Sequence, residues 1–350
     1  MSALVNEAVR PAAVPAPSSE AAAFHAALDG YAPTPLRELP EVAAELGLGA
    51  VAVKDESDRL GLPAFKVLGA SWAVERTLRE RADVDTLVAA SAGNHGRAVA
   101  RVAALRGLRC RIFLPARSAP ARREAIASEG AEVVVVDGAY EEAVERAAAE
   151  ARRPGAAEIA DVGESGPARW VIDGYATLFD EVAEQAPAPF DLVVVPVGVG
   201  SLGAAAARFG AAAGARVVAA EPAAAACLTA SLAAGEPVEV PTPGTSMAGL
   251  DCAEVSLAAW PSLRDGLHGS VTVTDAEAHA AMRELAAAGL AIGDSGAAPL
   301  AALRTLATDP GAAALRDFVG LGPESRVVLI ATEGPTDPEG YARTVGGAQP

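Results

Sequence analysis

The distribution of amine side chains is the most informative feature of this 350-residue chain. Only two of its 28 basic residues are lysines, Lys54 and Lys66, and the two lie within one short stretch. The others are arginines, which stay protonated, whereas a deprotonated lysine is a nucleophile that forms an imine with a carbonyl compound. A chain whose composition favours arginine is expected to keep a lysine at positions that require an amine. The alternative is that one or both lysines remain by chance.

Lys66 lies in the segment 63–70, just ahead of a predicted helix over 71–81. The positive end of a helix dipole lowers the pKa of a nearby lysine. The sequence therefore predicts a neutral, reactive amine at this position. A solvated surface lysine is the alternative.

A loop of small and polar residues, 91–96, follows one predicted strand and precedes a predicted helix. Backbone N–H groups exposed at such a junction favour a carboxylate, so the loop is a candidate substrate-binding site. Its candidate residues are Ser91, Ala92, Gly93, Asn94 and His95. Helix capping by Ser91 or Asn94 is the alternative. For His95 a structural, hydrogen-bonded role is favoured over a catalytic one.

A second loop, residues 198–203, matches the pattern G-x-G-x-x-G between a predicted strand and a predicted helix. A glycine-rich loop at a helix N-terminus binds a phosphate of any kind. Glu221 ends the next predicted strand, near the spacing at which a dinucleotide enzyme places its ribose-binding acid, so an NAD(P)-dependent dehydrogenase is one interpretation. The loop lies past the midpoint of the chain, however, whereas a dinucleotide fingerprint usually opens its domain. Thr332 ends a further predicted strand and places a hydroxyl where a ligand could meet it; a turn cap is the alternative.

Two series of alternating strands and helices must position these loops. The predicted strands cover residues 86–90, 111–114, 132–136, 191–197, 216–220, 270–273 and 326–331. Such alternation is typical of parallel sheets that are covered by helices. The predicted fold class is therefore α/β, with two open twisted parallel-sheet lobes and the active site in the cleft between them.

Composition and charge argue against several other classes of protein. The net charge of -17 argues against nucleic-acid binding, because proteins that bind nucleic acid carry an excess of basic residues. No run of roughly twenty residues is apolar enough for a membrane helix. Residues 1–20 lack the regions of a signal peptide and are predicted to form a flexible arm. Cys110, Cys227 and Cys252 suit a reducing cytoplasm and show no metal-ligand spacing, so no metal site is predicted.

Taken together, the motifs resemble fold type II pyridoxal-phosphate enzymes, the group of threonine dehydratase and tryptophan synthase β, and most closely the diaminopropionate ammonia-lyases. The matching segments run in family order: Lys54–Ser57, Ala64–Gly69, Gly93–Arg97, Gly174–Leu178, Met247–Leu250, Ser295–Ala297 and Thr332–Gly334. The resemblance implies a small domain over about 67–165 and a large cofactor-binding domain formed by 21–66 and 166–350. By analogy it also implies a homodimer.

The resemblance implies a role for each matching residue. Lys66, next to Phe65, would hold pyridoxal 5'-phosphate as an imine and take the α-proton of the substrate. Asn94 would bond the 3′-oxygen of the cofactor, and Thr332 would face its pyridine nitrogen. The residues implied to cradle the phosphate are Gly198, Val199, Gly200, Ser201, Leu202 and Gly203. Asp161 is the nearest counterpart of a second family carboxylate, although the local spacing differs.

The implied activity is an α,β-elimination that converts a small L-amino acid to a 2-keto acid and ammonia. The first candidate substrate is 2,3-diaminopropionate, followed by serine and threonine. Ala92 departs from the diaminopropionate ammonia-lyases, which carry there an aspartate that handles the D-isomer, and agrees with the threonine dehydratases. Because alanine cannot transfer a proton, we predict strict L-specificity. The alternatives are a β-replacement in a specialised biosynthetic pathway, the dehydrogenase, and a cofactor-free binding protein.

Overall fold

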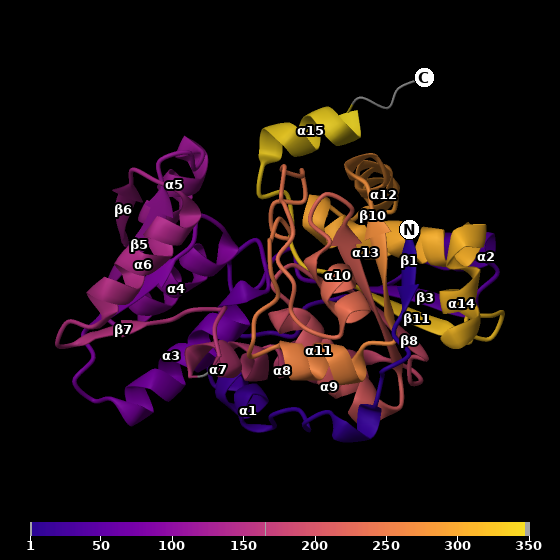
Figure 1. Cartoon of the computed structure of the whole chain (residues 1–350), viewed down its shortest axis with the longest axis horizontal. Helices are drawn as coiled ribbons and strands as arrows, with labels where there is room; N and C mark the ends of the chain where they lie inside the picture. The colour runs from indigo at the N-terminus through magenta and orange to yellow at the C-terminus, as the bar shows by residue number, and fades with distance from the viewer. Residues whose placement is uncertain (1, 165, 347–350) are drawn as a thin grey trace.

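Two β-sheets organise the molecule, whose computed structural model describes residues 2–164 and 166–346 (Figure 1). The larger sheet has the strand order β1-β10-β9-β8-β11-β3-β2, and the smaller has the order β6-β5-β4-β7. The strands are β1 (Ala3–Val5), β2 (Leu36–Glu38), β3 (Ala50–Asp55), β4 (Thr86–Ala90), β5 (Arg109–Pro115), β6 (Glu132–Val136), β7 (Ala156–Glu158), β8 (Leu192–Pro196), β9 (Arg216–Pro222), β10 (Gly269–Val273) and β11 (Arg326–Ala331). The predicted α/β class with two sheet lobes is confirmed.

Parallel pairing dominates both sheets because their central strands are apolar along nearly their whole length. β8 is buried throughout, and β11 is buried after its first residue. Strands that are covered by helices on both faces need such uninterrupted apolar runs. The large sheet departs from the prediction at its two edges, where β1 and β2 pair antiparallel with β10 and β3.

Helices cover the sheets and pack on two main apolar cores, which the large sheet separates. The helices are α1 (Glu20–Ala26), α2 (Pro40–Leu46), α3 (Lys66–Glu80), α4 (Asn94–Leu105), α5 (Pro120–Ala127), α6 (Tyr140–Ala151), α7 (Pro167–Gly174), α8 (Ala176–Gln185), α9 (Ser201–Ala213), α10 (Cys227–Ala234), α11 (Trp260–Gly266), α12 (Asp275–Ala287), α13 (Asp294–Thr308), α14 (Ala313–Phe318) and α15 (Pro338–Gly346). The apolar residues of α8 and α9 belong to one core, whereas those of α12 and α13 belong to the other. In Figure 1, α4, α5 and α6 surround the small sheet at the left, away from α12 and α13.

The N-terminal segment is ordered, so the prediction of a flexible arm over 1–20 is wrong for the residues that the structure describes. Ala3–Val5 adds an edge strand beside Gly269–Val271. The side-chain amide of Asn6 then donates to the carbonyl oxygens of Arg264 and Leu267, each over 2.7 Å. A three-residue strand is too short to give an alternating pattern, which is why the sequence did not indicate it.

The division of strands between the sheets supports the proposed domains. All four strands of the small sheet lie between residues 86 and 158, and all strands of the large sheet lie outside that range. α3 packs against both α4 and α7 and so connects the two parts. A small domain over about 67–165 and a large one formed by 21–66 and 166–350 remain our proposal for the exact boundaries.

Candidate active site

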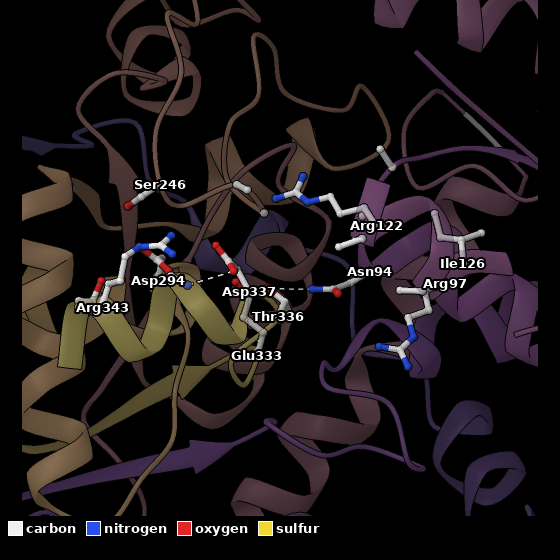
Figure 2. Close-up of a pocket in the computed structure, with 18 of the residues that line it drawn as sticks. Asn94, Arg97, Arg122, Ile126, Ser246, Asp294, Glu333, Thr336, Asp337 and Arg343 are labelled. Carbon is white, nitrogen blue, oxygen red and sulfur yellow. Dashed lines mark hydrogen bonds between the residues drawn. The ribbon is translucent and has the colours of Figure 1, made fainter. Parts of the chain in front are cut away.

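Two adjoining cavities are lined by loops that follow parallel strands, where ligands bind in open α/β sheets. The smaller is lined by Phe65, Lys66, Asn94, Pro196, Val197, Gly198, Val199, Gly200, Ser201, Leu202, Gly249, Leu250, Ser295, Thr332 and Glu333. The larger has a volume of about 390 Å³ and extends from α4 and α5 to α15 (Figure 2). Asn94, Gly249 and Glu333 line both cavities, so the two spaces form one continuous candidate site.

Lys66 is the first residue of α3, and its Nζ donates a hydrogen bond to Oδ2 of Asp161 over 2.9 Å. Burial lowers the pKa of this lysine, but the charge of Asp161 and the hydrogen bond to it, together with Tyr175 and Cys252, outweigh that effect and leave the pKa above its ordinary value. The prediction of a neutral amine is therefore wrong for this arrangement, because a direct ion pair outweighs the helix dipole. Lys66 becomes a nucleophile only after its proton leaves, and Asp161 is the carboxylate in contact with it.

Asp161 follows β7, a short strand that the sequence analysis did not predict. Its carboxylate faces two basic side chains, because Nδ1 of His95 lies 3.9 Å from the same Oδ2 that binds Lys66. Burial raises the pKa of this carboxyl, but His95 and Lys66 together hold it below its ordinary value. The structure thus places Asp161, the nearest counterpart of the second family carboxylate, directly beside Lys66.

The glycine-rich loop between β8 and α9 fits a phosphate group. Gly200 has φ +99°, and a Cβ there would lie 2.5 Å from Cδ1 of Leu263. A Cβ at Gly198 would lie 2.9 Å from Sγ of Cys252, so glycine is required at both positions. The first backbone bond of α9 runs from Ala204 to the carbonyl of Gly200, so the N–H groups at the preceding three positions are left free to bind an anion.

The other candidate cofactor ligands surround the same cavity. Thr332 is 5% exposed and lies at the end of β11, and its carbonyl oxygen accepts a bond from the Phe65 N–H over 3.2 Å. The Phe65 ring packs against Tyr175 with 4.6 Å between ring centroids. Ser201 donates from its hydroxyl to the carbonyl of Asp161 over 2.9 Å, so its backbone N–H is the group left for a phosphate. This donor set fits pyridoxal 5'-phosphate.

The loop over 91–95 divides into two groups of residues. Ala92, Gly93 and Asn94 line the larger cavity. The hydroxyl of Ser91 instead accepts a bond from the Gly93 N–H over 3.2 Å, which forms a local turn. The buried His95 directs Nε2 at the carbonyl oxygen of Ile159 over 2.7 Å and is not among the residues that line either cavity.

Glu333 is the main lining residue to which the sequence analysis gave no role. It is buried, and Oε2 accepts a bond from the side-chain amide of Asn94 over 2.6 Å. Burial raises the pKa of this carboxyl despite that bond. Its position inside the motif that begins at Thr332 was the available signal. The contribution of α15 was missed as well, and Figure 2 shows Asp337 and Arg343 reaching the larger cavity from it and its entry loop.

Two further residues singled out in the sequence serve the fold. Lys54 is completely buried, and its Nζ donates to Glu181 over 2.6 Å, to the Thr34 carbonyl over 2.7 Å and to Gln185 over 2.9 Å. A compact ammonium group matches three converging oxygens, which a planar guanidinium cannot do in the same space. Glu221 accepts from the N–H groups of Leu228 and Thr229 at the start of α10, so it is not free to bind a ribose.

Neither a membrane helix nor a metal cluster is found in the part of the chain that the structure describes. None of its helices combines the length and apolarity required to cross a bilayer. Within the same residues, no three His, Cys, Asp or Glu side chains gather as metal ligands would.

Comparison with known proteins establishes the class of enzyme. Residues 27–333 match the family described as pyridoxal-phosphate dependent enzyme. The chain therefore belongs to the pyridoxal-phosphate-dependent enzymes, and its cofactor is pyridoxal 5'-phosphate. This finding overturns the dehydrogenase interpretation of the glycine-rich loop and the interpretation as a cofactor-free binding protein.

Particular relatives extend over nearly the whole chain. Diaminopropionate ammonia-lyase of Salmonella typhimurium is 33% identical, over 92% of this chain and 90% of the relative. The crystal structure of the Escherichia coli diaminopropionate ammonia-lyase with an aminoacrylate-PLP azomethine intermediate matches with a TM-score of 0.90 at 30% identity, over 99% of this chain and 97% of that one. The biosynthetic L-threonine dehydratase of Escherichia coli is 30% identical over 72% of this chain and 48% of its own length.

Proposed function

We propose that this chain is an ammonia-lyase that removes the β-substituent of a small L-amino acid, with L-2,3-diaminopropionate as the first candidate substrate and L-serine and L-threonine next. The observation that carries the proposal is the placement of the Lys66 amine beside the glycine-rich loop and next to Asp161. The products are pyruvate and ammonia for diaminopropionate, with both nitrogens released.

In this proposal each group of residues has a distinct task. Lys66 would hold the cofactor covalently and would take the α-proton of the substrate at its Nζ. The backbone N–H groups of Ser201 and its neighbours would hold the phosphate, and Asn94 and Thr332 would bind polar atoms of the ring. When bound, pyridoxal phosphate withdraws electrons from the substrate's α-carbon, so that the α-proton becomes removable and the β-substituent can leave.

The loop and the larger cavity receive the substrate. The small residues Ala92 and Gly93 leave room for the substrate carboxylate near the start of α4, where the helix dipole favours an anion. Asp161 stabilises the positive charge that remains on Lys66 after proton abstraction, since the two groups are already in hydrogen-bonding contact.

A visible absorption spectrum and product analysis test this proposal together. The purified protein should be yellow, and addition of the correct L-amino acid from a panel should change the spectrum and release a 2-keto acid. Lys66→Ala should lose both the visible band and the activity. Lys66→Arg is the matched control, because it keeps the charge beside Asp161 but cannot bond covalently to the cofactor. Full activity in either variant contradicts the proposal.

Product identity separates elimination from β-replacement. Elimination yields pyruvate and ammonia from diaminopropionate alone. A β-replacement enzyme instead yields a new β-substituted amino acid and requires a second nucleophile. We further propose that the enzyme acts in the cytoplasm as a homodimer. Sedimentation of the purified protein tests the dimer, and fractionation of the cells that make it tests the location.

A further inference from the structure

His95 has one hydrogen-bonded ring nitrogen and one without a partner. Nε2 lies 2.7 Å from the carbonyl oxygen of Ile159, and because a carbonyl only accepts, Nε2 carries a proton. Nδ1 is buried and has no hydrogen-bond partner among the described residues. It faces Oδ2 of Asp161 at 3.9 Å. The side chain is 4% exposed, so bulk water does not compensate the lone nitrogen.

The charge on Nδ1 decides whether this contact is favourable. A neutral Nδ1 presents its lone pair to the carboxylate of Asp161, whereas a protonated Nδ1 presents an N–H and a positive charge. The same carboxylate oxygen accepts the hydrogen bond from Lys66 at 2.9 Å. Lys66 and His95, at the starts of α3 and α4, can therefore each place a positive charge beside the buried carboxylate of Asp161.

We propose that His95 is a positioning residue that gains a proton on Nδ1 whenever Lys66 gives up its positive charge, and so keeps Asp161 ionised and in place. One proton enters at Nδ1 as one leaves Nζ, which conserves the positive charge beside the carboxylate. This inference rests on the proposed role of Lys66, whose amine must change its charge during the reaction.

The other titratable groups around Asp161 do not supply this charge. Tyr140 on α6, Tyr175 before α8 and the thiol of Cys252 all interact with Asp161 or Lys66. Burial raises the pKa of each of them, that of Cys252 to about 12. They stay neutral at neutral pH, and an imidazole is the side chain that ordinarily changes charge there.

Histidine NMR titration of the full chain without cofactor tests the inference. The chain has four histidines. Burial lowers the pKa of His25 and of His268 to about 4, so these two do not interfere near neutral pH. A His279→Gln background then identifies the His95 resonance.

Removal of the Lys66 charge should move the protonation of His95. In Lys66→Gln we expect the His95 midpoint to rise by about one pH unit or more, a tenfold change in the protonation equilibrium. Adding Asp161→Asn should abolish the rise. An unchanged or lowered midpoint in Lys66→Gln, or a rise that persists without the Asp161 carboxylate, overturns the inference. Lys66→Met serves as the second variant if Lys66→Gln does not fold.

A variant of His95 tests the role in the loaded enzyme. His95→Gln can keep the bond to Ile159 but has no group at the Nδ1 position. We expect it to retain the visible cofactor band while the acidic limb of its kcat/KM profile moves to higher pH, since Asp161 is then protonated more easily. An unmoved limb overturns the inference and leaves the proposed function standing, whereas an active Lys66→Ala enzyme overturns the proposed function itself.

Discussion

The side-chain amide of Asn94 donates a hydrogen bond to the carboxyl group of Glu333 across the candidate site, with 2.6 Å between Nδ2 and Oε2 (Figure 2). Asn94 begins α4 beside the small sheet, and Glu333 follows β11 of the large sheet. This bond therefore joins the two lobes at the place where both cavities meet. The two residues are 239 positions apart in the chain.

Glu333→Ala should destabilise the protein through that bond. The substitution removes the acceptor of the half-buried Asn94 amide, and a hydrogen bond of this kind contributes about 0.5–1.5 kcal/mol. Glu333→Gln keeps an oxygen acceptor and suits the raised pKa of the native carboxyl, so it should cost less. Urea denaturation gives both free energies of unfolding. A glutamine variant that is less stable than the alanine variant would contradict this explanation.

Substitution by methionine should affect mainly stability at Lys54 and mainly activity at Lys66. Lys54→Met removes one cation from a buried network with Glu181 and should cost about 3–5 kcal/mol of stability, because it leaves a buried charge incompletely paired. Lys66→Met should abolish activity with a smaller loss of stability, since its side chain is 20% exposed. Thermal unfolding and activity assays of both variants check this. Equal losses of stability would show that the two ion pairs are energetically alike.

Glu221 should make stability depend on pH below neutrality. Burial raises its pKa from 4.5 to about 7, although the bonds from Thr229 and Leu228 oppose the shift. Because the folded pKa exceeds the unfolded one, the stability from this group is fully present below pH 4.5 and is lost as pH rises through about 7. Glu221→Gln should flatten that slope of the unfolding free energy. Denaturation curves at about pH 5 and about pH 7.5 measure it, and identical slopes in both proteins would refute the assignment.

Ala92 should restrict the enzyme to L-amino acids. It lines the larger cavity and carries no group that can transfer a proton. The native enzyme should eliminate L- but not D-2,3-diaminopropionate, and Ala92→Asp should gain activity on the D-isomer. Ala92→Asn is the size-matched control that should not. Similar native rates on the two isomers would show that another group serves the D-substrate.

The strands were the most predictable part of the fold. The sequence places β6 and β11 within their observed bounds, because buried parallel strands form apolar runs that end at turn residues. The three-residue strand β7 and the C-terminal helix α15 were not predicted. β7 is too short for a pattern, and α15 is a short helix without a fully buried residue, so its apolar pattern is weak.

The residues that line the candidate site could be predicted by type, but their environment could not. The scarcity of lysine and the spacing of the glycines single out Lys66 and Gly200 from local sequence alone, and both line the smaller cavity. The contact between Lys66 and Asp161 joins residues 95 positions apart, so it cannot be predicted from local spacing. That contact reverses the expected direction of the lysine pKa, which shows why a dipole argument fails when the partners are unknown.

The N-terminal edge strand bears on how the protein can be handled. Ala3–Val5 occupies the outer edge of β10. Deleting it would expose unpaired N–H and C=O groups along β10, and an exposed strand edge of that kind can pair with strands of other chains. Trimmed preparations, or purification tags that replace the first residues, should therefore precipitate more readily than the intact polypeptide.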